Sequence, residues 1–158
     1  MFTESEMQEV KDFLANTSPE SSIYLGCDSM RIKKNRNWLA LYTMVIVVHL
    51  DSKHGAKLFG YNVLEPDFEK NPGRPFMRMM NEAYKVVEMY SAFENELIPM
   101  DTVEIHLDIN PSEVHGSSCA VKAASGYILG TCGIVPKVKP DAFAASYAAD
   151  RMVRGLKI

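Results

Sequence analysis

One apolar run constrains the fold of this chain more than any other feature: it covers residues 38–50, with the sequence WLALYTMVIVVHL. It is shorter than the roughly 20 residues that a membrane-spanning helix needs, and loop-like segments flank it. We therefore interpret it as the central strand of a sheet. The composition, with 47% hydrophobic and 23% charged residues, is ordinary for a soluble globular protein, so we expect one domain over residues 1–158.

The first residues predict an amphipathic helix rather than a targeting segment. Residues 4–15 place apolar side chains on one face, with Thr3 as the N-cap and Glu6 completing a capping box. The stretch lacks the basic start and apolar core of a signal peptide, so we expect a cytoplasmic protein that does not enter a membrane. The three cysteines form no C-x-x-C pair, which favours free thiols.

Three strand-like segments follow the first helix. We expect strands at residues 22–28, 38–49 and 56–64, and the last two are joined by DSKHGAK, a tight reversal. This order predicts an antiparallel meander. A loop rich in proline, EPDFEKNPGRP, comes next, and residues 76–96 then show apolar side chains at helical spacing.

The second half of the chain alternates between strand and helix. We expect strands at residues 102–108 and 133–139, a helix over 115–130 that ends at Gly130, and a final helix at 141–155. Helical crossovers force the first, fourth and fifth strands to run parallel. The predicted fold is therefore α/β: a mixed five-stranded sheet, built from a three-strand antiparallel meander plus two parallel strands, with helices on both faces and an extra N-terminal helix.

Two of the predicted strands end in an aspartate. Asp28 closes IYLGCD and Asp108 closes TVEIHLD, and the topology places these two strand ends side by side. Open α/β sheets bind ligands at the carboxyl ends of parallel strands, so the pair lies where a site is expected. A lone aspartate at a strand end is commonly a turn residue or a helix cap, and that alternative stays open for each of them.

The motifs IYLGCDS, HLDIN and KPDAFAASYAADR resemble the ribonuclease H-like superfamily, and within it most closely the YkuK family. The likeness covers nearly the whole chain. Members of the superfamily carry an acid on the first strand, one at the end of the fourth and one on the last helix, which implies these roles for Asp28, Asp108 and Asp141. The helix glutamate of the superfamily, where present, would correspond to Glu82. An exposed surface glutamate is the alternative for that residue, and Glu88 is a competing candidate.

The resemblance implies a nuclease that hydrolyses phosphodiester bonds with divalent metal ions. Its carboxylates would hold two Mg²⁺ or Mn²⁺ ions roughly 4 Å apart, one activating water and the other stabilising the leaving oxygen. Crowded acids raise one another's pKa, and a divalent cation would keep them ionised. The substrate would be RNA, DNA or a hybrid of the two. The rival hypotheses are a non-catalytic module that binds nucleic acid or protein on the same fold, and an interaction protein that dimerises through a sheet edge.

The last expected helix offers two acids, Asp141 and Asp150. They fall on opposite faces, because nine residues at about 100° each turn a helix through roughly 900°. Asp141 shares its sector with small apolar residues suited to pack on the sheet, so we expect it to join the site, with a simple N-cap as its alternative. Asp150 is expected on the helix surface, paired with Arg154.

Basic residues are the remaining functional candidates. The net charge of −3 gives no support for broad attraction to nucleic acid, but cations are concentrated in MRIKKNRN, between the first two strands. This segment is either a solvated loop or a phosphate contact beside Asp28. The candidate phosphate contacts in this segment are Arg31, Lys33, Lys34 and Arg36. Lys122 and Lys139 are further candidates from the last two crossovers, and an ordinary surface lysine is the alternative for each. For His106 we favour a hydrogen-bonded structural role over a proton shuttle or a phosphate contact.

Overall fold

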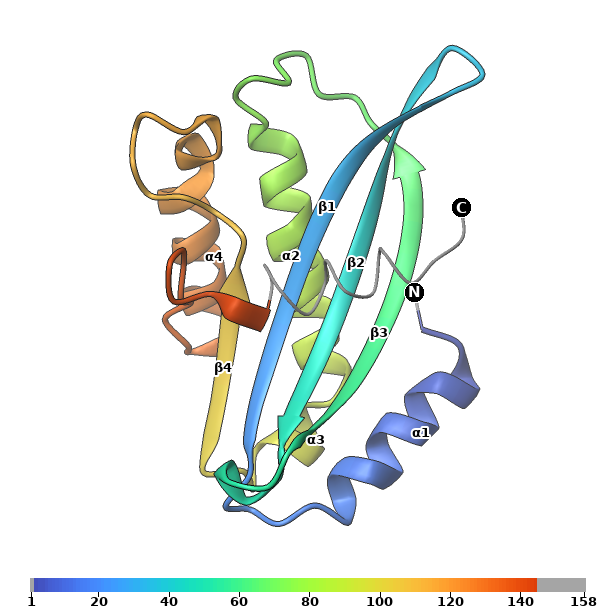
Figure 1. The fold of residues 1–158 in the computed structure, drawn as a ribbon, viewed down its shortest axis with the longest axis vertical. Coiled ribbons are helices and arrows are strands. Elements are labelled where there is room, and N and C mark those ends of the chain that lie inside the picture. Colours follow the sequence, from blue (N-terminus) through green and yellow to red (C-terminus); the bar gives the residue numbers. More distant parts are fainter. Residues whose placement is uncertain (1, 145–158) are drawn as a thin grey trace.

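The structure is a computed structural model, and it describes residues 2–144 (Figure 1). Four strands form one mixed sheet in the order β3-β2-β1-β4. The strands are β1 (Ser22–Lys34), β2 (Asn37–His49), β3 (Ala56–Pro66) and β4 (Thr102–Leu107). β2 pairs antiparallel with both β1 and β3, whereas β1 and β4 run parallel. The predicted α/β fold, with an antiparallel meander and a parallel strand beside it, is confirmed to this extent.

In the described part of the chain, one helix precedes the sheet, two lie between β3 and β4, and one follows β4. They are α1 (Glu4–Ala15), α2 (Phe76–Ala92), α3 (Glu94–Leu97) and α4 (Val121–Cys132), with 3₁₀ turns η1 (Leu50–Ser52) and η2 (Gly116–Ala120). α1 begins at the predicted capping box: the Thr3 hydroxyl accepts the Glu6 backbone N–H, and the Glu6 carboxylate accepts the Thr3 N–H. Within residues 2–144, no helix is both long and apolar enough to cross a membrane.

Two of the predicted helices differ from expectation. The single helix predicted over residues 76–96 is divided at Phe93, which lies between α2 and α3. The helix predicted from residue 115 begins only at Val121, because Gly116–Ala120 form the 3₁₀ turn η2. It continues past Gly130 to Cys132, because the left-handed backbone that closes it is supplied by Gly133, with φ of 68°.

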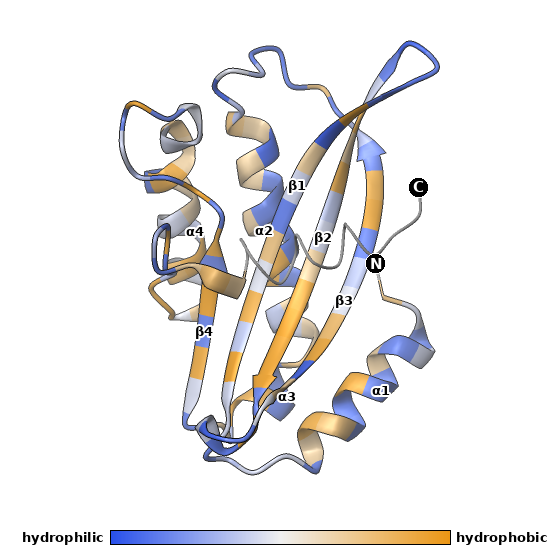
Figure 2. Ribbon diagram, in the orientation of Figure 1, coloured by the Kyte–Doolittle hydropathy of each residue, from blue (hydrophilic) through white to orange (hydrophobic). Residues whose placement is uncertain are grey.

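A single large core lies between the sheet and the helices. In β1, Ile23, Leu25 and Cys27 point into this core together with buried side chains of α1, α2 and α4. Figure 1 shows α2 crossing behind β1 and β2, and Figure 2 shows hydrophobic residues along much of β2, as a central strand requires. The other face of the sheet carries a smaller apolar cluster around Val45 and Ala144. The helix expected at 141–155 lies largely outside the described residues.

The basic segment between the first two strands is not a loop, and this prediction was wrong. β1 continues to Lys34 and pairs with β2 as far as Asn37, so the segment forms the distal part of a long hairpin. Asn35 and Arg36 form the turn, with φ of 49° and 67°. Two consecutive residues with positive φ are typical of the tight hairpin turns whose twist matches that of the flanking strands. Four positive charges within residues 31–36 are typical of an exposed loop, whereas the pairing with β2 decides the conformation here.

The predicted fifth strand is also absent from the described sheet. Residues 133–139 contribute one parallel bridge, between Lys137 and His106, in which the backbone N–H of Lys137 donates to the Ile105 carbonyl at 2.8 Å. Pro136 and Pro140 bracket this contact, and proline has no N–H to extend a ladder. The sheet therefore has four strands, with a single-bridge contact at its β4 edge.

The turn of the long hairpin gives a direct stability test. Arg36→Gly should raise the free energy of unfolding by about 0.5–1 kcal/mol, because glycine adopts positive φ without the Cβ penalty. Lys34→Gly is the matched control, since Lys34 is in extended strand and glycine should destabilise it. Urea unfolding measures both, and a loss of stability in Arg36→Gly would contradict the turn geometry.

Candidate active site

The parallel pairing of β1 with β4 brings two acids together. The register pairs Cys27 with Leu107 at the end of the ladder, so Asp28 and Asp108, the next residue of each strand, emerge side by side. Their carboxyl groups are close enough to share a hydrogen bond, and the backbone N–H of Ser29 donates to Asp28 Oδ1 at 2.8 Å. Burial, and then the negative charge of Asp108, raise the pKa of Asp28 from an ordinary 3.8 to about 7. The pair predicted from the topology is present.

Lys139 is the cation beside this pair. Its ammonium lies 2.9 Å from Asp108 Oδ1, and this hydrogen bond raises the pKa of the lysine. The side chain keeps 41% of its surface exposed, so it remains accessible to solvent. Lys139 was predicted as a phosphate contact, and the structure places it at the acidic pair.

Glu82 reaches the same region from α2. It is fully buried, so the alternative of an exposed surface glutamate is wrong. Burial first, and then the charge of Asp28, raise its pKa well above the ordinary value. The hydroxyl of Ser29 donates to Glu82 Oε1. Glu82 Oε2 is buried, and no hydrogen-bond partner for it occurs among the described residues.

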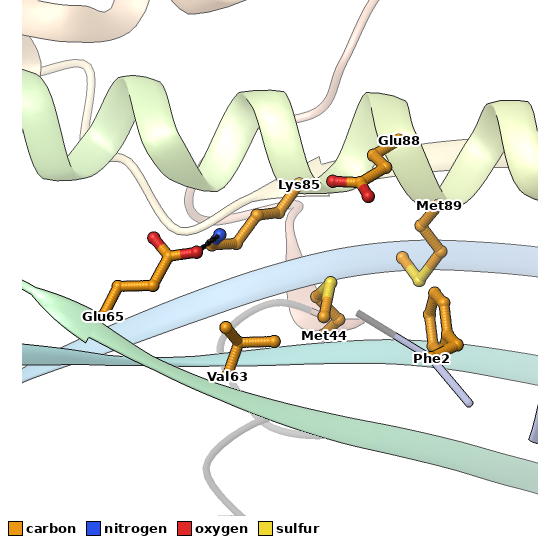
Figure 3. A pocket seen from close by; sticks show the side chains of 7 residues that line it. All are labelled: Phe2, Met44, Val63, Glu65, Lys85, Glu88 and Met89. Atoms are coloured by element: carbon orange, nitrogen blue, oxygen red, sulfur yellow. Dashed lines mark hydrogen bonds and ion pairs between the residues drawn. The ribbon is translucent and has the colours of Figure 1, made fainter.

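Glu88, the competing helix glutamate, is elsewhere. Figure 3 shows it on α2 beside Lys85, at a cavity that is also lined by Phe2 and Val63. Lys85 is paired there with Glu65 of β3 at 2.6 Å. The structure therefore brings Glu82, and not Glu88, to the aspartate pair.

Two polar residues of the site were missed by sequence reasoning. Ser29 follows Asp28 directly, and Arg78 lies one helical turn before Glu82 on α2. The Arg78 guanidinium donates from Nη1 to the Ser29 carbonyl at 3.0 Å and to the Ser29 hydroxyl at 2.8 Å. The available signal was the helical spacing of Arg78 and Glu82, which places both side chains on one face.

Asp141 is at the edge of the described chain. It is exposed, its backbone N–H donates to the Val138 carbonyl at 2.9 Å, and its charge acts on His106 and Lys137. Its role as a metal ligand stays a prediction. Asp150 lies outside the described residues. Within residues 2–144, no three His, Cys, Asp or Glu side chains are already gathered closely enough to hold a metal ion.

His106 has the structural environment that we favoured for it. The ring is fully buried, with Nε2 2.9 Å from Glu104 and Nδ1 accepting the backbone N–H of Ala144 at 3.1 Å. Burial lowers the pKa of His106, because desolvation disfavours the imidazolium. Through the hydrogen bond from Ala144 and a ring contact with Phe143, His106 connects residues 143–144 to β4.

The basic candidates separate into two groups. Arg31 is tied to Asp67 at 2.6 Å and stacks over the Trp38 ring at 4.1 Å, so its guanidinium is already engaged. The hairpin tip, meaning Lys33, Lys34 and Arg36, is exposed. Figure 2 shows this end of the hairpin in the hydrophilic colour, extending beyond the rest of the sheet. Lys122 is also exposed, on α4.

Comparison with known proteins agrees with this geometry. The ribonuclease H-like family profile matches residues 5–154, which is nearly the whole chain. The chain belongs to the ribonuclease H-like family. Searches among curated proteins and among solved structures give no significant match. Membership confirms the superfamily resemblance drawn from the motifs, and a closer relation to the YkuK family is compatible with it.

The raised pKa of Asp28 predicts how stability depends on pH in this ribonuclease H-like domain. The folded carboxyl keeps its proton to about pH 7, whereas the unfolded one loses it near 3.8, so the native state loses stability as pH rises between these values. Asp28→Asn cannot ionise and should gain stability over the parent by at most about 4 kcal/mol at pH 8. The gain should vanish at pH 4.

Chemical denaturation at both pH values measures this difference. An Asp28→Asn variant that is less stable than the parent at pH 8 would contradict the electrostatic account of the pair. Asp12→Asn on α1 is a matched control, because Asp12 is exposed and away from the acidic pair. Its effect should be small at either pH.

Proposed function

We propose that this protein is a divalent-metal-dependent nuclease that hydrolyses phosphodiester bonds in RNA or DNA. The observation that carries the proposal is the adjacent pair Asp28 and Asp108, with the buried Glu82 beside it. The pKa values of Asp28 and Glu82 are both raised, by burial and by the neighbouring negative charge. Acids that hold protons because their charges repel one another would ionise if a cation joined them.

The side chains present fit Mg²⁺ or Mn²⁺. All three carboxyl groups offer oxygen, which hard divalent cations prefer. Glu82 Oε2 is buried and has no hydrogen-bond partner among residues 2–144, which is an unfavourable state for a carboxyl oxygen unless something binds it. Asp28 and Asp108 would hold the ions together with Glu82, and Asp141 would supply a further ligand.

Two bound ions would activate a water molecule and stabilise the leaving oxygen of the phosphodiester. The chain's own residues provide the rest of the environment. Lys139 offsets part of the negative charge of Asp108, which makes the approach of a phosphodiester less unfavourable. The hairpin tip carries exposed cations that attract the nucleic-acid backbone.

A non-catalytic nucleic-acid-binding module is the second candidate. The observation that favours it is the exposed hairpin tip, whose lysines and arginine need no metal ion to contact phosphates. In that case the acids would be structural, and metal ions would not stabilise the protein.

Metal binding separates the two candidates. The parent should be stabilised by about 1.4 kcal/mol at a Mg²⁺ or Mn²⁺ concentration ten times the Kd, because a ligand of the native state shifts unfolding. Asp28→Asn and Asp108→Asn should abolish this effect and cleavage. Asp141→Asn should weaken both, whereas Asp150→Asn and the control Asp12→Asn should leave them unchanged. Thermal unfolding with and without metal, and cleavage of labelled RNA and DNA, provide the measurements.

Three results would count against this proposal. A parent that no divalent ion stabilises would favour the binding module. If Asp150→Asn loses metal binding and Asp141→Asn keeps it, then Asp150, and not Asp141, is the ligand from the last helix. Cleavage that persists in Asp28→Asn would remove the aspartate pair from the reaction.

The hairpin tip predicts the salt dependence of nucleic-acid binding. Replacing Lys33, Lys34 and Arg36 by Ser should weaken binding and reduce the slope of log K against log salt, by about 0.9 for each duplex phosphate that the variant no longer neutralises. Metal affinity should hardly change, because the tip is not part of the acidic pair. Fluorescence anisotropy at several salt concentrations measures the slope.

The control removes equal charge from another part of the surface. Its three substitutions change exposed lysines to Ser, namely Lys53, Lys57 and Lys70. If the tip variant has the same slope as the parent, or if the control lowers the slope equally, the tip does not contact phosphates and is an ordinary solvated hairpin.

A further inference from the structure

Ser29 contacts three other polar residues of the site: Asp28, Glu82 and Arg78. Its backbone N–H donates to Asp28 Oδ1 at 2.8 Å, and its hydroxyl donates to Glu82 Oε1. The hydroxyl also accepts from Arg78 Nη1 at 2.8 Å. A guanidinium can only donate, so this contact uses a lone pair of the hydroxyl and leaves its single proton for Glu82. The Ser29 hydroxyl therefore accepts from Arg78 and donates to Glu82.

The result for Glu82 is asymmetric. Oε1 is held by Ser29, whereas Oε2 is buried and has no hydrogen-bond partner among the described residues. A carboxyl group that served only to fill the core would leave this oxygen as an uncompensated cost. One fixed oxygen and one available oxygen is the arrangement expected of a ligand that is oriented before its cation binds.

The start of α2 is fixed to β1 by a second chain of contacts. Glu69 accepts the backbone N–H groups of Met77 and Arg78 at 2.8 and 3.2 Å, which caps the first turn of the helix. The backbone N–H of Glu69 donates to Asp67 Oδ1 at 3.0 Å, and Asp67 pairs with Arg31 of β1. Arg78 is thus anchored at its backbone through the loop and at its side chain through Ser29.

We propose that Ser29 and Arg78 are positioning residues that orient Glu82 so that its Oε2 is presented to a divalent cation shared with Asp28. This inference deepens the proposed function and rests on it. Neither residue touches the metal or the substrate. Ser29 acts on Glu82 through its hydroxyl, and Arg78 acts through Ser29.

Mn²⁺ titration followed by electron paramagnetic resonance of the free ion tests this role. Ser29→Ala should lower Mn²⁺ affinity about 10- to 100-fold, the usual effect of removing a group that orients a ligand. Ser29→Thr should restore most of the affinity, because it keeps the hydroxyl and suits a strand. Arg78→Met should lower affinity as well, since Ser29 loses the contacts to its hydroxyl and carbonyl that hold it in place.

Ser21→Ala is the matched control. Ser21 is buried just before β1, and its hydroxyl accepts the backbone N–H of Asp51 at 2.9 Å, away from the acids. This variant should lose stability but bind Mn²⁺ like the parent. A purely structural role for Ser29 would give the same pattern in Ser29→Ala.

The outcomes distinguish the two proposals. If the parent binds Mn²⁺, Asp28→Asn does not, and both Ser29→Ala and Arg78→Met bind like the parent, the positioning role is overturned and the metal site stands. If circular dichroism shows that Ser29→Ala is unfolded, the Mn²⁺ affinity of Arg78→Met decides: an affinity equal to that of the parent overturns the positioning role, and a lower affinity supports it. If the parent itself binds no Mn²⁺, the proposed function and the positioning role both fail.

Discussion

The parallel pairing of β1 with β4 is the interaction on which the site depends. It ends at Cys27 and Leu107, and one residue further along each strand the chain places an aspartate. Because parallel neighbours bring the same ends of their strands together, Asp28 and Asp108 are adjacent although they are far apart in sequence. Two further residues lie beside that pair: Lys139, from the segment after α4, and Glu82, from α2.

The balance of charge around the pair is incomplete. A backbone N–H and one ammonium compensate the aspartates, yet the pKa of Asp28 still rises to about 7. Ordinary capping aspartates keep their charge, because turn N–H groups stabilise the carboxylate. The protein keeps several acids partly uncompensated at the carboxyl end of a parallel strand pair, in the place where this class of sheet binds ligands.

Sequence reasoning succeeded where the signal was local or followed from topology. The capping box at Thr3 and Glu6 and the adjacency of Asp28 and Asp108 are examples. It failed where distant contacts decide. Nothing in the local pattern shows that 133–139 holds only one bridge to the sheet, or that the basic segment is itself the end of β1 and pairs with β2. Likewise the burial of Glu82 depends on how α2 lies across β1.

A crystal soaked in Mn²⁺ and measured at the manganese absorption edge tests the central claim most directly. The account predicts anomalous density within about 2.5 Å of carboxylate oxygens of both Asp28 and Asp108, with Glu82 Oε2 directed at the same density. Density only at other surface carboxylates, with Asp28 and Asp108 still hydrogen-bonded to each other, would contradict it.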